Sequence, residues 1–120
     1  MALRAIRGAT QLQADDATEL EAAVVELMLA VLERNELGTD ALVSVLFTST
    51  PDLRSQFPAA AARTLGIGDV PLLCAQELAV VGALPRVVRL LAHVETDRAR
   101  SEISHVYLRG AEVLRQDLAQ

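Results

Sequence analysis

The sequence contains no lysine, and all eleven of its basic residues are arginines. This absence excludes enzymes that form a Schiff base through lysine, attachment of pyridoxal phosphate, and nucleotide sites that need a Walker lysine. An arginine guanidinium pairs with a carboxylate through two parallel hydrogen bonds. The basic residues that are present therefore favour a small anionic ligand.

Cysteine and histidine are also scarce. Cys74 is the single cysteine, which excludes an internal disulfide and a zinc site built from several cysteines. The two histidines, His93 and His105, are too few and wrongly placed to indicate a metal site or a catalytic triad. We therefore predict no metal and no cofactor.

Aromatic residues and positive charge are both too limited for a nucleic-acid partner. Phe47, Phe57 and Tyr107 are the three aromatic residues, too few for a platform on which bases stack. The formal net charge is -5, whereas nucleic-acid phosphates demand a basic surface. We expect no nucleic acid to bind.

Long hydrophobic runs are missing as well. None approaches the roughly 20 residues that a membrane-spanning helix needs, and the opening MALRAIRGAT lacks the apolar segment of a signal peptide. We predict a cytoplasmic protein without membrane association.

The chain is nevertheless rich in apolar residues. They make up 52% of its 120 residues, and the mean hydropathy is +0.30. This length predicts one domain over residues 1–120. Because a domain this small cannot hide so much apolar surface by itself, we expect burial between copies of the chain.

Two apolar runs, Val70–Ala75 and Pro85–Val94, predict central strands too hydrophobic to have a solvent-exposed face. Glu77 follows the first run, and Arg89 lies in the middle of the second. An unpaired ion there costs several kcal/mol, so Arg89 must meet a carboxylate, a cluster of acceptors or an anionic ligand. The pattern leaves two interpretations open, a buried structural ion pair and a binding site.

The other patterns predict an α+β domain. Asp16 and Glu19 have the spacing of a capping box at the start of a long amphipathic helix. The expected elements are a strand at Leu3–Ala9, this helix over residues 20–32, a strand at Leu42–Thr48, a short helix that starts at Pro58 and ends before Gly66, a strand at Glu102–Leu108, and a flexible tail over residues 110–120 that begins with one helical turn. This order favours a mixed β-sheet with helices on one face, and the other face is left to meet a copy of itself.

Five stretches together carry a family resemblance: PDLRSQFPAAAARTLG at Pro51–Gly66, VPLLCAQE at Val70–Glu77, LPRVVRLL at Leu84–Leu91, HVYLRGAEVLR at His105–Arg115 and the opening RAIRGAT. They closely resemble the monofunctional AroH-class chorismate mutases. The resemblance implies a homotrimer of α+β subunits that forms a pseudo-α/β-barrel of ferredoxin-like build, with an active site at each of three interfaces. It also implies the Claisen rearrangement of chorismate to prephenate, at the branch toward phenylalanine and tyrosine, without a cofactor.

By position, the resemblance also implies which residues form the site. The catalytic residues would be Arg89, Arg7, Glu77 and Tyr107, and the substrate-binding residues would be Phe57, Arg63, Leu73, Cys74, Ala75, Gln76 and Arg115. In this scheme Arg89 places positive charge at the breaking ether oxygen, while Glu77 accepts a hydrogen bond from the ring hydroxyl. Arg7 would orient Glu77.

Two positions depart from the family pattern. Ala60 stands where relatives often carry a basic residue, which would weaken the positive charge at the entrance. Gln116 replaces a frequent proline, which leaves the path of the tail open.

Two other functions fit parts of the same pattern. One is a trimeric imine deaminase, because such proteins resemble this chain in fold and also place an arginine at a subunit interface. The other is a non-catalytic, small-molecule-binding trimer of ferredoxin-like build. The block from Cys74 to Glu77, taken together with Arg7, favours the mutase over the deaminase.

Overall fold

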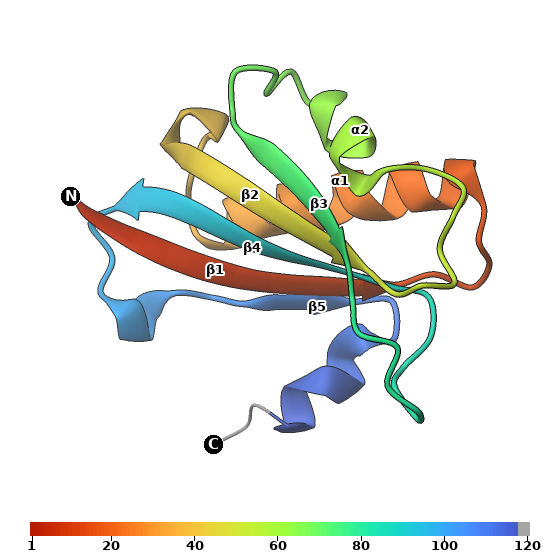
Figure 1. Cartoon of the computed structure of the whole chain (residues 1–120). Coiled ribbons are helices and arrows are strands. Elements are labelled where there is room, and N and C mark those ends of the chain that lie inside the picture. The colour runs from red at the N-terminus through yellow and green to blue at the C-terminus, as the bar shows by residue number, and fades with distance from the viewer. Residues whose placement is uncertain (118–120) are drawn as a thin grey trace.

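A computed structural model describes residues 1–117 as one five-stranded mixed sheet with both α-helices on one face (Figure 1). The elements in chain order are β1 (Ala2–Gln11), α1 (Ala17–Arg34), the 3₁₀ helix η1 (Thr39–Ala41), β2 (Leu42–Ser49), α2 (Pro58–Arg63), β3 (Leu72–Gln76), β4 (Val87–Thr96), the 3₁₀ helix η2 (Arg100–Glu102), β5 (Val106–Leu108) and the 3₁₀ helix η3 (Ala111–Asp117). The predicted α+β fold is confirmed.

The strand order is β3-β2-β4-β1-β5, with β4 in the centre. β4 runs antiparallel to both β1 and β2. The edge strands β5 and β3 run parallel to β1 and β2 respectively. The sheet is therefore mixed, and its two edges carry the shortest strands.

The long helix α1 forms as its sequence pattern predicts. The side chain of Asp16 accepts a hydrogen bond from the backbone N–H of Glu19 at 2.9 Å, which caps the first turn. The predicted capping box is only half formed, because the Glu19 carboxylate accepts from the backbone N–H groups of Gln13 and Ala14 instead of Asp16. The cap thus joins α1 to the loop that follows β1.

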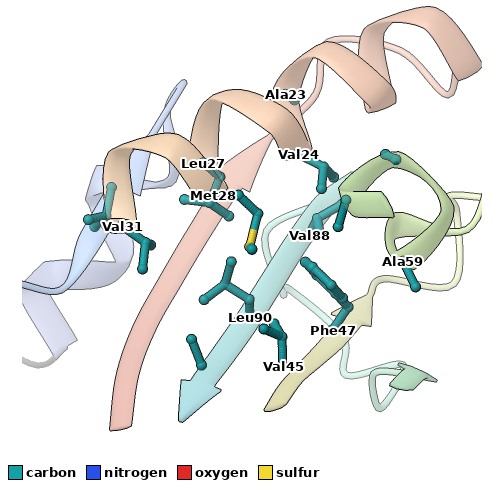
Figure 2. Close-up of a cluster of buried hydrophobic side chains, with 14 of the residues drawn as sticks. Ala23, Val24, Leu27, Met28, Val31, Val45, Phe47, Ala59, Val88 and Leu90 are labelled. Atoms are coloured by element: carbon teal, nitrogen blue, oxygen red, sulfur yellow. The ribbon is translucent and has the colours of Figure 1, made fainter. Parts of the chain in front are cut away.

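The core lies between α1, α2 and one face of the sheet (Figure 2). The α1 side chains Leu27 and Met28 pack over Leu90 of β4, beside Phe47 of β2. Gly8 of β1 permits this approach, because a Cβ there would lie 3.2 Å from both Leu27 and Leu90. The helix is therefore seated directly on the central strands.

The predicted last strand, Glu102–Leu108, is wrong in its first half. Residues 100–102 form η2, and β5 begins at Val106. The backbone N–H of Ser104 donates to Oδ1 of Asn35 at 2.8 Å, and Nδ2 of Asn35 donates to the Ser104 carbonyl at 2.9 Å. The buried Asn35 amide therefore satisfies backbone groups that a strand ladder would otherwise have used.

The tail is more regular than the predicted single helical turn. Residues 111–117 form η3, and its Ala111 packs against Tyr107, Ala9 and Val87 on the face of the sheet opposite α1. This small cluster covers one end of that face. The predicted mobile end falls on residues 118–120, outside the described residues.

Most of the face opposite α1, called the free face below, is uncovered in the single chain. Leu3 of β1 is 59% exposed and Leu73 of β3 is 66% exposed. The loop after β3 adds Leu78, Val80 and Val81, all exposed. The prediction that the Val70–Ala75 and Pro85–Val94 runs are central strands without an exposed face is therefore wrong for one copy. β3 lies at an edge of the sheet, and both α-helices pack on the same side.

Thr10 generates a prediction about stability. Its side chain is fully buried beneath α1, and Oγ1 has no hydrogen-bond partner among the described residues. A buried hydroxyl without a partner costs about 1–3 kcal/mol, and valine has nearly the same shape. We expect Thr10→Val to raise the free energy of unfolding by about 1 kcal/mol in urea titrations.

Thr50 provides the matched control. Its buried hydroxyl donates to Asp52 and accepts from the backbone N–H of Val87. Thr50→Val should lower the free energy of unfolding by about 1–3 kcal/mol, because it leaves the buried N–H unpaired. Equal losses in the two variants would contradict the assignment of Thr10 as an unpaired group.

Candidate active site

An ion pair between Arg89 and Glu77 is the centre of the candidate site. Nε of Arg89 lies 3.1 Å from Oε2 of Glu77, and the two side chains are 44% and 16% exposed. The prediction that Arg89 meets a carboxylate is confirmed. The prediction that Arg89 is buried is wrong for the single chain, because no element within residues 1–117 covers its side chain.

The sheet register brings the two residues together. Arg89 lies opposite Thr48 of β2, and Thr48 lies opposite Ala75 of β3. Glu77 follows β3, and its backbone N–H donates to the carbonyl of Ser49 at 2.9 Å, which continues the pairing beyond the last strand residue. The Glu77 side chain therefore reaches back over Thr48 toward Arg89.

The Thr48 hydroxyl completes this arrangement. Oγ1 of Thr48 donates to Oε2 of Glu77 at 2.7 Å, so this one oxygen accepts from both Thr48 and Arg89. The sequence analysis missed Thr48. Its place opposite Arg89 depends on the strand register, which no local pattern reveals.

Arg7 and Tyr107 lie on the same face of the sheet. Ala9 of β1 is directly opposite both Arg89 and Tyr107, and Arg7 is two residues before Ala9. Diagonal neighbours on one face have Cα atoms about 7–8 Å apart, so Arg7 lies within reach of Arg89. Among the described residues no hydrogen bond joins the side chains of Arg7 and Glu77, so the predicted orienting contact is not formed within one copy.

His105 holds the backbone at Arg7. Its Nδ1 accepts a hydrogen bond from the backbone N–H of Arg7 at 2.9 Å, and this bond requires an unprotonated Nδ1. Burial of the imidazole lowers the pKa of His105, and the positive charge of Arg7 lowers it further. His105 was assigned no chemistry from the sequence, and the structure gives it a structural contact beside the site.

A second group of predicted residues lines a pocket of about 320 Å³ next to β3. The predicted members are Phe57, Cys74, Ala75 and Gln76, and the loop before α2 adds Leu53, Arg54, Ser55, Gln56 and Pro58, with Ser49 from β2. Phe57 is 71% exposed. Its aromatic ring therefore has little cover within one copy.

Two contacts fix this pocket. Sγ of Cys74 accepts from the backbone N–H of Ala59 at 3.4 Å, which places the thiol on the α2 side of the sheet. The carboxylate of Asp15 accepts from the backbone N–H groups of Arg54 and Ser55 at 3.0–3.1 Å. These hydrogen bonds lower the pKa of Asp15, and the bond from the Arg54 N–H has the largest effect.

The single chain does not gather all of the predicted site residues. Arg63 is exposed near the end of α2 and lies outside the pocket lined by Phe57. Arg115 is exposed on η3, and Leu73 faces solvent on β3. Of the two departures from the family pattern, Ala60 is half-buried in α2, and the Gln116 side chain lies outside the described ones. In one copy the predicted residues therefore form one group around Arg89 and one around Phe57, and Arg63, Leu73 and Arg115 belong to neither.

No cluster of three or more His, Cys, Asp or Glu side chains suited to a metal occurs within residues 1–117. In the same part of the chain, no helix has both the length and the apolar character of a membrane span. The arrangement offers fixed positive charge and hydrogen-bond acceptors, which can bind and polarise a small anion.

Comparison with known proteins finds similarity over nearly the whole chain. The model of the family chorismate mutase type I matches residues 3–118. The chorismate mutase AroH of Thermus thermophilus is 47% identical over 117 residues, which cover 97% of this chain and 96% of that protein. The corresponding protein of Bacillus subtilis (strain 168) is 39% identical over 120 residues, covering 99% and 94%.

A solved structure is similar as well. The chorismate mutase from Clostridium thermocellum superimposes with a TM-score of 0.89 and 42% sequence identity, and the match covers 91% of this chain and 97% of that one. The similarity therefore extends from sequence to the complete fold.

The contact between His105 and Arg7 generates a pH prediction. Because the pKa of His105 is lower in the folded state than the ordinary value of about 6.5, the unfolded chain binds the proton first as the pH falls. The contribution of unprotonated His105 to the free energy of unfolding is fully present above about pH 6.5 and is lost as the pH falls below it. Urea titrations should therefore show a smaller loss of stability between about pH 7.5 and 5 for His105→Asn than for the wild type.

The control for this experiment is His93→Asn. His93 lies on β4 and contacts Ser44, and among the described residues it makes no hydrogen bond to the Arg7 backbone. This variant keeps His105 and should keep the wild-type decline with pH. A His105→Asn curve that runs parallel to the wild type would refute the prediction.

Proposed function

The chain belongs to the chorismate mutase type I family and acts as a chorismate mutase, an isomerase of aromatic amino acid biosynthesis, and we propose that its active sites form between neighbouring copies in a homotrimer. The observation that carries the proposal is the Arg89–Glu77 pair on the free face, with Arg7 and Tyr107 beside it. Arg89 alone is too open to hold a dianion away from water.

The division of the site residues supports an interfacial site. Phe57 and Cys74 line a pocket at the β3 edge, whereas Arg7 and Tyr107 lie toward the β5 edge of the same sheet. A head-to-tail contact that places the β3 edge of one copy next to the β5 edge of another is heterologous, and such contacts form a ring when the rotation between copies closes. A ring of three would form the predicted pseudo-α/β-barrel.

The exposed apolar surface supports self-association. Leu3, Leu73, Leu78, Val80 and Val81 are each at least 59% exposed and lie on the free face or in the loop after β3. Large apolar side chains this exposed on one face of a sheet are typical of protein–protein contacts. A closed ring would remove it from water.

The chemistry explains why arginines suit this reaction. Chorismate carries two carboxylates, and its rearrangement to prephenate is a unimolecular shift that forms no bond to protein. The enzyme needs to hold a reactive conformer and to place positive charge at the breaking ether oxygen. It needs neither a nucleophile nor a general base, and we propose that it uses no cofactor or metal.

Arg89 is our proposed donor to the ether oxygen. Its Nε binds Glu77, and among the described residues no hydrogen bond or ion pair occupies its two terminal nitrogens. These two nitrogens are therefore available to the substrate. One such donor stabilises a transition state by about 3–4 kcal/mol.

The other residues would bind and orient the substrate. Arg7 and Tyr107 would bind carboxylates, and Glu77 would accept from the ring hydroxyl through Oε1. Phe57 would pack against the ring. The remaining residues proposed to contact the substrate, from the wall of the pocket and from its entrance, are Arg63, Leu73, Cys74, Ala75, Gln76 and Arg115.

The family assignment argues against the two alternatives considered from the sequence, the imine deaminase and the non-catalytic small-molecule-binding trimer. Both kinds of protein would have a similar fold, but neither accounts for the match to the mutase family over residues 3–118. The cytoplasmic location stays a prediction.

The role of Arg89 generates a kinetic prediction. Arg89→Lys replaces a planar fork held by Glu77 with a single ammonium, which cannot keep both contacts. We expect kcat to fall by at least about 100-fold, measured as the loss of chorismate absorbance. Arg100→Lys, an exposed arginine on η2, is the control and should retain wild-type kcat.

Wild-type turnover by Arg89→Lys would remove Arg89 from this role. Equal losses in Arg89→Lys and Arg100→Lys would instead point to an unspecific effect of exchanging arginine for lysine, because both substitutions keep the positive charge.

The assembly generates a second prediction. Sedimentation should show a particle of three 12.9 kDa chains. Leu73→Glu places a charge on the free face and should dissociate the trimer with loss of activity. Leu29→Glu is the matched control, because Leu29 is 49% exposed on the outer side of α1, and this variant should remain trimeric. A wild-type monomer that turns over chorismate would contradict the interfacial site.

A further inference from the structure

We propose that Thr48 is a positioning residue that sets the orientation of Glu77 and, through it, of Arg89. The inference rests on the proposed function and adds a residue that the resemblance did not include. Thr48 is half-buried on β2, directly opposite Arg89 on one side and Ala75 on the other. It therefore lies between the strand that carries Arg89 and the strand that leads to Glu77.

The hydrogen bonds show how Thr48 can act. Oε2 of Glu77 accepts from Oγ1 of Thr48 at 2.7 Å and from Nε of Arg89 at 3.1 Å. Two donors on one oxygen fix which carboxylate oxygen faces Arg89. Oε1 of Glu77 makes no hydrogen bond among the described residues, and it is the oxygen left to accept from a ligand hydroxyl.

Without this hydroxyl the carboxylate is poorly held. The last torsion of a glutamate side chain is broad, so Arg89 alone does not determine the plane of the carboxylate. Threonine is stiff at χ1 because it is branched at Cβ, and β2 fixes its backbone. Thr48 therefore supplies a rigid donor where Arg89, on a long flexible side chain, does not.

Ser44 offers a comparison on the same strand. Its side chain lies on the same face as Thr48, four residues earlier, and Oγ lies 3.2 Å from Nδ1 of His93. Its hydrogen bond does not involve Glu77 or Arg89. Removal of a hydroxyl that has only a structural role on this face should change the kinetics no more than removal of the Ser44 hydroxyl does.

The first experiment compares steady-state kinetics of the full-length variants with chorismate. We expect Thr48→Val to lower kcat/KM at least about tenfold, mainly through kcat, because a hydrogen bond to a charged group is lost. Thr48→Ser should recover most of the wild-type value, since it keeps the hydroxyl. Ser44→Ala should match the wild type. Wild-type kinetics in Thr48→Val, or no recovery in Thr48→Ser, would overturn the inference.

A double-mutant cycle with Glu77→Ala tests whether Thr48 acts through Glu77. If it does, Thr48→Val causes no further loss in the Glu77→Ala background. The same fold loss in both backgrounds would overturn the inference. If Thr48→Val does not fold, Thr48→Ala takes its place in the cycle.

The two proposals fail in different ways. A wild-type protein that leaves chorismate unchanged refutes the proposed function. An active wild type whose Thr48→Val variant is equally active refutes only the role of Thr48.

Discussion

The position of Arg89 depends on a carboxylate that neighbouring strands bring to it. β4 provides the guanidinium, β2 provides the Thr48 hydroxyl, and the residue just after β3 provides Glu77. Adjacent strands in a sheet lie about 4.8 Å apart, so side chains along one row keep fixed spacings. A reaction that gains from a fixed charge, and needs no proton transfer, suits a site built on such a row.

The one-sided placement of the helices links this site to assembly. α1 and α2 bury one face around Leu27, Met28 and Phe47, and this leaves the other face, with Arg89, open to solvent. A small apolar-rich domain cannot cover two faces of a five-stranded sheet with two helices. The surplus of apolar residues in the composition therefore appears on the free face, where a neighbouring copy can cover both it and the substrate.

Much of the fold could be predicted because its signals are local. The spacing of Leu20, Val24 and Leu27 predicts α1, and the Asp16 cap marks its start. The predicted strand at Glu102–Leu108 failed in its first half, because Asn35 binds the Ser104 backbone from 69 positions away in the sequence. An interaction between residues this distant leaves no periodic signal near either of them.

For the site, the sequence by itself determined that Arg89 needs a partner of opposite charge, since a guanidinium within an apolar strand is costly without one. Family resemblance pointed to Glu77 as a further site residue. Only the tertiary structure decided that Thr48 shares the carboxylate, that His105 holds the Arg7 backbone, and that Phe57 lies in a separate group. The reason is physical: burial cost depends on the residue and its immediate neighbours, whereas strand register depends on the packing of the whole sheet.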